Sequence, residues 1–201
     1  MKKDIQVFIF GDSIAWGAWD DEKCGWVNRL RLRFRKEYSG DFIIVHNCSV
    51  SGDTAERVTK RFAGEFRSRF RHAADEAVII FAIGINDTQQ KYNLNENDFK
   101  VRIRKLIKTA RELTPHIAFV GITGVEDNAS NTQYNNDRIA LFDRTLEKVC
   151  GQKKVIFVKM GKFQITDYAD GIHPNALGHE KMAGKIFNEI KPLIHSGDRE
   201  V

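Results

Sequence analysis

The sequence predicts one α/β domain over residues 1–201, in which about five mainly parallel strands form a sheet with helices on both faces. Short apolar runs alternate with longer amphipathic ones, as in strands joined by crossover helices. The run over 78–83 is apolar throughout, which is typical of a strand that helices cover on both faces. A chain of 201 residues is also long enough to bury the core of such a three-layer α/β/α domain.

The first half of the chain is predicted to contain two strands and two helices. Residues 5–10 are apolar and rich in strand-forming side chains, and the run stops at Gly11. In 26–38 and again in 55–70, large apolar residues recur every four positions, which predicts amphipathic helices. Residues 42–46, between these helices, form the second predicted strand.

The second half repeats the pattern. The strand over 78–83 is followed by a helix over 97–113, which ends before Pro115 because the residue before a proline disfavours helical geometry. The remaining predicted elements are a strand over 117–122, a helix over 136–149 that ends near Gly151, a strand over 155–158, and a helix over 175–194 after Pro174. This order predicts a flavodoxin-like arrangement, in which ligands bind at the carboxyl ends of the strands.

The composition is that of an ordinary globular protein, with 42% hydrophobic and 29% charged residues. The apolar run over 5–10 is shorter than the core of a signal peptide, and no run approaches the ~18 residues of a membrane span. The three cysteines, Cys24, Cys48 and Cys150, are odd in number and far apart, which favours neither a disulfide framework nor a metal site. We therefore expect a cytoplasmic protein without a membrane span, a metal or another cofactor.

Positive charge is concentrated in two of the predicted helices. The net charge is +5, and much of the positive charge lies in 29–36 and 57–71. Basic outer faces of amphipathic helices explain this pattern, and a nucleic-acid or anionic-membrane surface is the alternative. Because no nucleic-acid-binding motif accompanies the charge, we expect no nucleic-acid partner. Salt-sensitive binding to DNA or RNA would show otherwise.

Polar and reactive residues follow four of the predicted strands. Gly-Asp-Ser at 11–13 follows the first strand, and Ser-Gly-Asp at 51–53 comes soon after the second. Gly-Ile-Asn-Asp at 84–87 follows the third, and Asp-Gly-Ile-His-Pro at 170–174 lies between the fifth strand and the last helix. Each segment alone is explained by an ordinary turn or helix cap. Together they place a serine, an asparagine and an Asp–His pair at the sheet edge where ligands bind.

The residue types at these positions suit nucleophilic catalysis. Ser13 lies at a strand end, where a tight turn at Gly11 would expose its hydroxyl to a ligand. The short spacing between Asp170 and His173 allows the carboxylate to orient the imidazole and to stabilise it when protonated. The same pair is compatible with two ligands of a metal ion, although no third ligand is evident. Asn86 carries a side-chain amide that is able to donate a hydrogen bond to an oxyanion.

Taken in order, these four segments resemble the SGNH hydrolases, also called GDSL esterases, a family named for Ser, Gly, Asn and His residues in four blocks. The resemblance runs from residue 10 to about residue 178, and its most specific part is the last segment with the helix that follows it. One departure is Ile14, which replaces the leucine of the usual Gly-Asp-Ser-Leu by another apolar residue. The resemblance implies a serine esterase that acts on a small-molecule ester without a cofactor.

The resemblance also implies a role for each matching residue. Ser13 is the expected nucleophile, His173 the expected base, and Asp170 the residue that orients it. The expected oxyanion donors are the backbone N–H groups of Ser13 and Gly52 and the side-chain amide of Asn86. Short acyl or acetyl esters are favoured because no long apolar lid segment is evident. Acyl transfer, thioester cleavage and lysophospholipid cleavage are alternatives, whereas the complete triad argues against a non-catalytic binding module.

Other residues near these segments have less specific predictions. Asp12 and Asp87 are expected to accept hydrogen bonds that hold loops, and His179 to lie at the surface or to be packed. Trp16 and Trp19 are expected either to line a substrate pocket or to pack in the core. The 123–136 segment is expected to shape the substrate site, and four of its polar residues are compatible with a hydroxyl-rich substrate: Glu126, Asp127, Asn128 and Asn131.

Overall fold

The computed structural model of this chain describes residues 2–126, 133–161 and 163–194. These residues form a five-stranded sheet in the order β2-β1-β3-β4-β5, and every pair of neighbouring strands is parallel. The predicted parallel sheet is therefore confirmed. The strands are β1 (Asp4–Gly11), β2 (Phe42–Asn47), β3 (Glu76–Ala82), β4 (His116–Val120) and β5 (Ile156–Val158).

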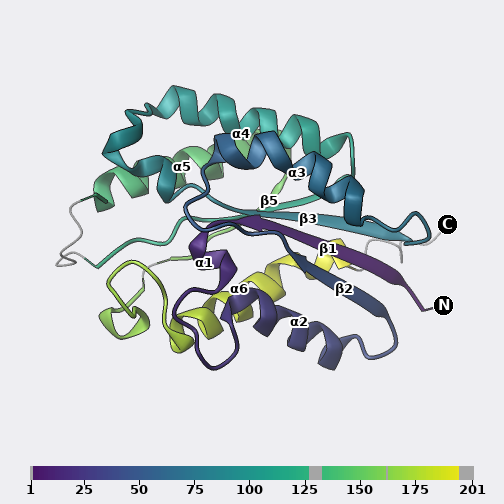
Figure 1. The fold of residues 1–201 in the computed structure, drawn as a ribbon. Helices are drawn as coiled ribbons and strands as arrows, with labels where there is room; N and C mark the ends of the chain where they lie inside the picture. The colour runs from purple at the N-terminus through teal and green to yellow at the C-terminus, as the bar shows by residue number, and fades with distance from the viewer. Residues whose placement is uncertain (1, 127–132, 162, 195–201) are drawn as a thin grey trace.

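Helices cover both faces of the sheet (Figure 1), which confirms the predicted three-layer α/β/α fold. One face carries α3 (Ala55–Arg69), α4 (Glu96–Arg111) and α5 (Asn136–Lys153). The other face carries α1 (Ser13–Trp16), α2 (Gly25–Glu37) and α6 (Ala176–Ile194). Short 3-10 helices lie in the connecting segments: η1 (Asn86–Thr88), η2 (Gln90–Tyr92) and η3 (Ile165–Asp167).

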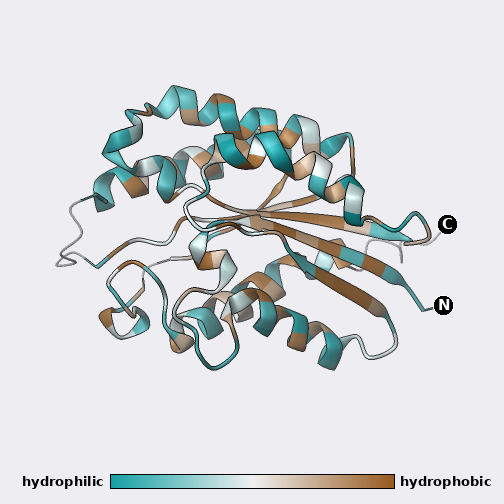
Figure 2. Ribbon diagram, viewed as in Figure 1, coloured by the Kyte–Doolittle hydropathy of each residue, from teal (hydrophilic) through white to brown (hydrophobic). Residues whose placement is uncertain are grey.

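The core lies between the sheet and each helix layer. The central strands β1 and β3 are buried along most of their length, and Figure 2 shows them as mainly hydrophobic. From α3, Phe62 and Phe66 pack against Phe10 and Phe8 of β1, with ring centroids 5.7 and 4.5 Å apart. The apolar positions spaced four apart thus face the sheet, which confirms the amphipathic helix predicted there.

The basic segment in α2 differs in part from its prediction. Trp26, Leu30 and Phe34 face the core as expected, but Arg29 is buried rather than on the outer face. Its guanidinium donates to the carboxylate of Asp20 at 2.8 Å and to the carboxylate of Glu180 in α6. Asp20 lies in the connection between α1 and α2. Arg29 therefore ties this connection to the helix layer, because a buried guanidinium requires carboxylate partners.

Element ends depart from the predicted ones by one to four residues, and the largest departure is α5, which continues through Gly151 to Lys153. The last helix begins at Ala176 rather than at residue 175, because the side-chain oxygen of Asn175 accepts hydrogen bonds from the N–H groups of Leu177 and Gly178. The four-residue helix α1 was not predicted, since so short a helix shows no periodicity. Within the described ranges, none of the helices has both the length and the apolar character needed to span a bilayer.

Candidate active site

The predicted site residues lie at the carboxyl edge of the sheet, where the ends of parallel strands meet. Ser13 begins α1 after β1, and Asn86 begins η1 after β3. Gly52 lies between β2 and α3. The 170–173 segment lies between β5 and α6, and it reaches back along this edge to Ser13.

A tight turn between β1 and α1 presents Ser13. Asp12 has an extended backbone, and its carboxylate accepts a hydrogen bond from the Ile14 N–H at 3.0 Å, so it caps α1. Gly11 is needed just before this cap. A Cβ at residue 11 would lie 2.3 Å from the Cβ of Ala15 and 2.8 Å from a carbonyl oxygen at the end of β3. The close approach of β1, β3 and α1 therefore depends on a glycine here.

Three of the predicted site residues form one hydrogen-bonded chain. Ser13 Oγ lies 2.9 Å from His173 Nε2, and His173 Nδ1 lies 2.8 Å from Asp170 Oδ2. With its proton on Nδ1, the imidazole donates to Asp170, and its Nε2 is free to accept the proton of the Ser13 hydroxyl. This arrangement is able to activate a serine as a nucleophile.

Backbone hydrogen bonds hold the 170–173 segment as a narrow turn. Tyr168 and Pro174 pair as an isolated antiparallel bridge, and the Ala169 N–H donates to the His173 carbonyl at 2.9 Å. The two ends of the turn are therefore fixed to each other. The imidazole is placed by backbone contacts as well as by its side-chain partners.

The carboxylate of Asp170 is shared between the ring and the backbone. Its Oδ1 accepts from the N–H groups of Ile172 and His173 at 3.0 and 2.7 Å, while Oδ2 contacts the ring. Partial burial opposes the charge on this carboxylate, but the hydrogen bonds from His173 and Ile172 outweigh it and lower the pKa of Asp170. Asp170 is therefore ionised at neutral pH, as an acceptor for imidazolium must be.

The predicted oxyanion residues Gly52 and Asn86 lie in connected segments. Asn86 is 5% exposed, and its Nδ2 donates to the carbonyl oxygen of Asp53 at 3.0 Å. Gly52, the residue before Asp53, has φ +78°, and the space where a Cβ would lie is open. A left-handed backbone rather than crowding thus favours glycine at residue 52.

Asp12 and Asp87 accept hydrogen bonds that hold loops, as predicted. The Asp12 carboxylate caps α1, as described above. The Asp87 carboxylate accepts a hydrogen bond from the Ala55 N–H at 2.9 Å, at the start of α3, and lies 3.6 Å from the Arg102 guanidinium. Both carboxyl groups are buried, and this burial raises the pKa of Asp12 and the pKa of Asp87 to about 7. Asp12 in the Ser13 turn and Asp87, which contacts the start of α3, therefore titrate near neutral pH.

The two tryptophans near Ser13 are not in the core. Trp16 and Trp19 are each 59% exposed, so the core-packing alternative is wrong for both. Trp16 ends α1, and it lies three residues beyond the predicted nucleophile.

His179 is a packed histidine, one of its two predicted placements. It is fully buried in α6, its Nδ1 accepts from the Trp26 N–H at 3.2 Å, and its Nε2 donates to the Ala18 carbonyl at 3.0 Å. Burial lowers the pKa of His179, which keeps it neutral. It therefore joins α6 to α2 and to the chain after α1.

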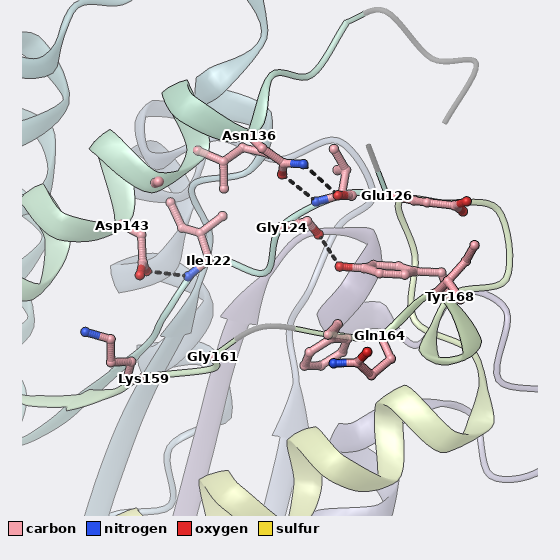
Figure 3. A pocket seen from close by; sticks show the side chains of 14 residues that line it. Ile122, Gly124, Glu126, Asn136, Asp143, Lys159, Gly161, Gln164 and Tyr168 are labelled. Atoms are coloured by element: carbon pink, nitrogen blue, oxygen red, sulfur yellow. Dashed lines mark hydrogen bonds between the residues drawn. The ribbon is translucent and has the colours of Figure 1, made fainter. Parts of the chain in front are cut away.

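A hollow of about 610 Å³ opens between the β4–α5 connection, the start of α5 and the β5–α6 connection (Figure 3). Two hydrogen bonds join its wall to the segment that carries His173: the Tyr168 hydroxyl donates to the Gly124 carbonyl at 2.8 Å, and the Glu126 N–H donates to the Gly171 carbonyl at 2.7 Å. The lining combines carboxylate and amide groups with apolar and aromatic side chains, among them Ile139 and Phe163.

Part of the 123–136 prediction concerns residues outside the described ranges, namely Asp127, Asn128 and Asn131. Of its four polar residues, Glu126 lines the hollow. Sequence reasoning missed Asn136, whose amide holds both the N–H and the carbonyl of Val125, at 3.0 and 2.8 Å. It also missed Gln89 and Tyr134, which contact Asn86. Isolated polar residues in connections carry no signal of such roles in a single sequence.

The alternative that Asp170 and His173 are two ligands of a metal ion requires further ligands close to them. Within 2–126, 133–161 and 163–194, no group of three or more His, Cys, Asp or Glu side chains is arranged to hold a metal ion. The Asp–His pair has Ser13 as its further neighbour instead. The thiols of Cys24, Cys48 and Cys150 are free.

Known structures share this fold. An acetylxylan esterase from Geobacillus stearothermophilus superimposes with a TM-score of 0.75 at 19% sequence identity, covering 94% of this chain and 95% of that one. A hydrolase from the metagenome of Lake Arreo in Spain gives a TM-score of 0.76 at 16% identity, with 94% and 96% of the two chains covered. At these identities the similarity establishes the α/β/α architecture.

Relatives are also found by sequence. Esterase TesA of Pseudomonas aeruginosa is 26% identical over 195 residues, which cover 94% of this chain and 89% of that protein. A multidomain esterase of Ruminococcus flavefaciens is 30% identical over 128 residues, which are 60% of this chain but 16% of that protein. This chain thus matches a small part of the longer relative. The model of the GDSL-like Lipase/Acylhydrolase family matches residues 9–181, from the end of β1 into α6. The chain therefore belongs to the GDSL-like Lipase/Acylhydrolase family, a family of carboxylic ester hydrolases.

Proposed function

We propose that the chain is a serine esterase in which Ser13, His173 and Asp170 form the catalytic triad. The observation that carries the proposal is the unbroken hydrogen-bonded chain from Asp170 through His173 to Ser13 Oγ. Family membership supports the same reaction class. The residues come from two distant parts of the sequence, and their contact at one sheet edge is expected of an active site in this type of fold.

The proposed reaction begins with attack of Ser13 Oγ on the ester carbonyl carbon. His173 Nε2 takes the hydroxyl proton as the new C–O bond forms, and ionised Asp170 stabilises the resulting imidazolium. The proton then passes from His173 to the leaving alkoxide, which departs as an alcohol and leaves an acyl-enzyme on Ser13. A water molecule, deprotonated by His173, releases the acid and restores the serine.

The negative charge on the carbonyl oxygen needs fixed donors during both attacks. We assign this role to the backbone N–H groups of Ser13 and Gly52 and to the side-chain amide of Asn86. The left-handed backbone at Gly52 and the buried, hydrogen-bonded Asn86 support the assignment, since fixed donors need no reorganisation in the transition state. Loss of one such donor is expected to lower kcat by about 10²–10³-fold.

For the substrate, we propose short acyl or acetyl esters of a hydroxyl-rich alcohol. The hollow beside the 170–173 segment supports this, because carboxylate and amide groups such as Glu126 and Asn136 line it together with aromatic rings. Hydroxyl groups and sugar faces suit such a mixture. The fold is also shared with an acetylxylan esterase.

The test is hydrolysis of p-nitrophenyl esters from acetate to decanoate, and of acetylated xylo-oligosaccharides, by wild type and Ser13→Ala. We expect Ser13→Ala to lose kcat by several orders of magnitude, and a remote control, Ser39→Ala, to match wild type. The kcat/KM for the p-nitrophenyl esters is expected to fall as the acyl chain lengthens. Retained hydrolysis by Ser13→Ala, or failure of a fluorophosphonate to label Ser13 in the wild type, would contradict the proposal.

A further inference from the structure

The side-chain amide of Asn86 makes three hydrogen bonds that together decide its orientation. Its Oδ1 accepts from the Tyr134 hydroxyl at 3.1 Å and from the Gln89 amide at 3.2 Å. Its Nδ2 donates to the Asp53 carbonyl at 3.0 Å. An asparagine amide offers two lone pairs and two N–H groups. Both lone pairs are therefore used, and within the described part of the chain one N–H is left for a ligand.

The opposite orientation of this amide is unfavourable at the Asp53 contact. A rotation by 180° would place Oδ1 against the Asp53 carbonyl oxygen, which has no proton to donate, and would turn Nδ2 towards the Gln89 amide and the Tyr134 hydroxyl. Two acceptors would then face each other in a site where Asn86 is 5% exposed. An unpaired polar group at such a site costs about 1–3 kcal/mol. The Asp53 carbonyl therefore fixes the orientation of Asn86 that leaves one N–H free.

Tyr134 and Gln89 are themselves fixed relative to each other. The Gln89 amide also donates to the Tyr134 hydroxyl oxygen, so the single hydroxyl proton of Tyr134 is directed to Asn86. Burial raises the pKa of Tyr134, which keeps this proton in place at neutral pH. The hydroxyl is therefore a donor to Asn86 throughout the working range of a histidine base.

The two segments that carry these residues are also tied together. Arg138, in the first turn of α5, donates to the Thr88 carbonyl at 2.7 Å and to the Leu94 carbonyl. Tyr134 precedes that helix, and Gln89 follows Thr88. The start of α5 and the connection after β3 therefore hold Tyr134 and Gln89 against Asn86.

We propose that Tyr134 and Gln89 are positioning residues that aim the free N–H of Asn86 at the oxyanion of the ester reaction. This inference rests on the proposed function, in which Asn86 is an oxyanion donor. Two donors on Oδ1 also polarise the amide, which strengthens the remaining N–H as a donor. Tyr134 and Gln89 thus act through Asn86, and they touch neither the nucleophile nor its base in the chain of hydrogen bonds described above.

The first measurement is the kinetics of p-nitrophenyl acetate hydrolysis by Tyr134→Phe. Phenylalanine keeps the ring and removes the hydroxyl donor. We expect kcat to fall about tenfold with KM within about twofold, because the oxyanion exists only in the transition state. Tyr92→Phe is the matched control on a neighbouring exposed tyrosine, and it is expected to behave as wild type. Gln89→Met is a second variant that removes the other donor, with the same expected split between kcat and KM.

A double-mutant cycle separates positioning from a merely structural role. In an Asn86→Ala background, Tyr134→Phe is expected to lower kcat by less than about twofold, since the group on which it acts is gone. An equal loss in both backgrounds, or unchanged kcat for both Tyr134→Phe and Gln89→Met, would overturn the inference. If Ser13→Ala abolishes activity while Tyr134→Phe and Gln89→Met leave kcat unchanged, the inference fails but the proposed serine esterase function is retained. If Ser13→Ala stays active, the proposed function itself fails.

Discussion

The turn that carries Ser13 adjoins buried polar groups, whereas the side chains of Asp170 and His173 are partly exposed. Asp12 in this turn, and Asn86 and Asp87 after β3, are each at most 5% exposed. By contrast, the side chains of Asp170 and His173 are 35% and 21% exposed, and they are held by a short turn. The hydrogen bond between Ser13 and His173 joins the two regions.

Because of this difference, we expect substitutions in the two regions to affect stability and activity to different extents. Changes in the Ser13 turn disturb packed groups and are expected to alter the free energy of unfolding as well as catalysis. Changes in the side chains of Asp170 and His173 remove few buried contacts, so catalysis is expected to suffer alone. Variants that contradict this separation would show that the two regions are energetically coupled.

The largest expected effect is the loss of activity on substitution of the partly exposed His173. His173→Ala removes the proposed base and is expected to lower kcat for p-nitrophenyl acetate by about 10⁴-fold or more. The midpoint of thermal unfolding is expected to change by no more than ~2 °C, since the imidazole is partly exposed and the backbone turn remains. The measurements are steady-state kinetics and thermal unfolding of the purified variant.

His179→Ala is the matched control for that comparison. His179 lies in the adjoining helix but is fully buried with two hydrogen bonds, so its loss is expected to destabilise the fold by ~2–4 kcal/mol. The folded fraction should keep most of its activity. A large unfolding effect of His173→Ala, similar to that of His179→Ala, would disprove the separation between the two regions.

The next largest effect is expected in the buried region, at Gly11. Gly11→Ala would bring a Cβ to within 2.3 Å of Ala15, so α1 must shift, and we expect a loss of ~1–3 kcal/mol in the free energy of unfolding. Because Ser13 begins α1, kcat is expected to fall in the same variant. Urea unfolding and ester hydrolysis measure the two effects.

Gly64→Ala serves as the control for Gly11→Ala. Gly64 lies within α3, where an added Cβ meets no atom within 4 Å. Alanine favours a helix over glycine by up to ~1 kcal/mol, so this variant is expected to be neutral or more stable. If Gly11→Ala behaved like Gly64→Ala, the packing account of the Ser13 turn would be wrong.

The comparison also explains what a single sequence could predict. Strand-end motifs with consecutive reactive residues, such as 11–13 and 170–174, were found because parallel strands gather at one edge. The topology places Ser13 and His173 at the same edge, but β3 and β4 separate β1 from β5, so their contact also depends on how the β5–α6 connection reaches back along that edge. The buried supports were predicted less well. Asp12 and Asp87 lie inside recognisable motifs, but Gln89 and Tyr134 are isolated polar residues in connections.

The burial of individual side chains was also predicted incompletely. The spacing of apolar residues predicted which face of α2 and α3 packs, yet it placed Arg29 on the outer face. Its burial is explained by carboxylate partners from other segments, among them Asp20. Similarly, Trp16 is exposed despite its apolar character, whereas its neighbours Ile14 and Ala15 in α1 are buried. Such positions depend on tertiary partners, which periodicity does not encode.

The smallest expected effect concerns pH and the carboxyl group beneath the nucleophile. Burial raises the pKa of Asp12 from 3.8 to about 7, so the folded state holds a proton that the unfolded state has already lost. The group therefore stabilises the fold most below pH ~4, and this contribution is lost as the pH rises to about 7.

Asp12→Asn keeps an oxygen that can accept from the Ile14 N–H but carries no charge. Relative to wild type, its free energy of unfolding is expected to rise between pH ~4 and pH ~7, by on the order of 1–3 kcal/mol, and to stay level above that range. Urea unfolding of both proteins at several pH values measures this difference. Asp87 provides the comparison, because its buried carboxyl remains in the variant and keeps part of the pH dependence. A difference between the two proteins that does not vary with pH would mean that Asp12 is ionised in the fold, and that the Ser13 turn tolerates a buried charge.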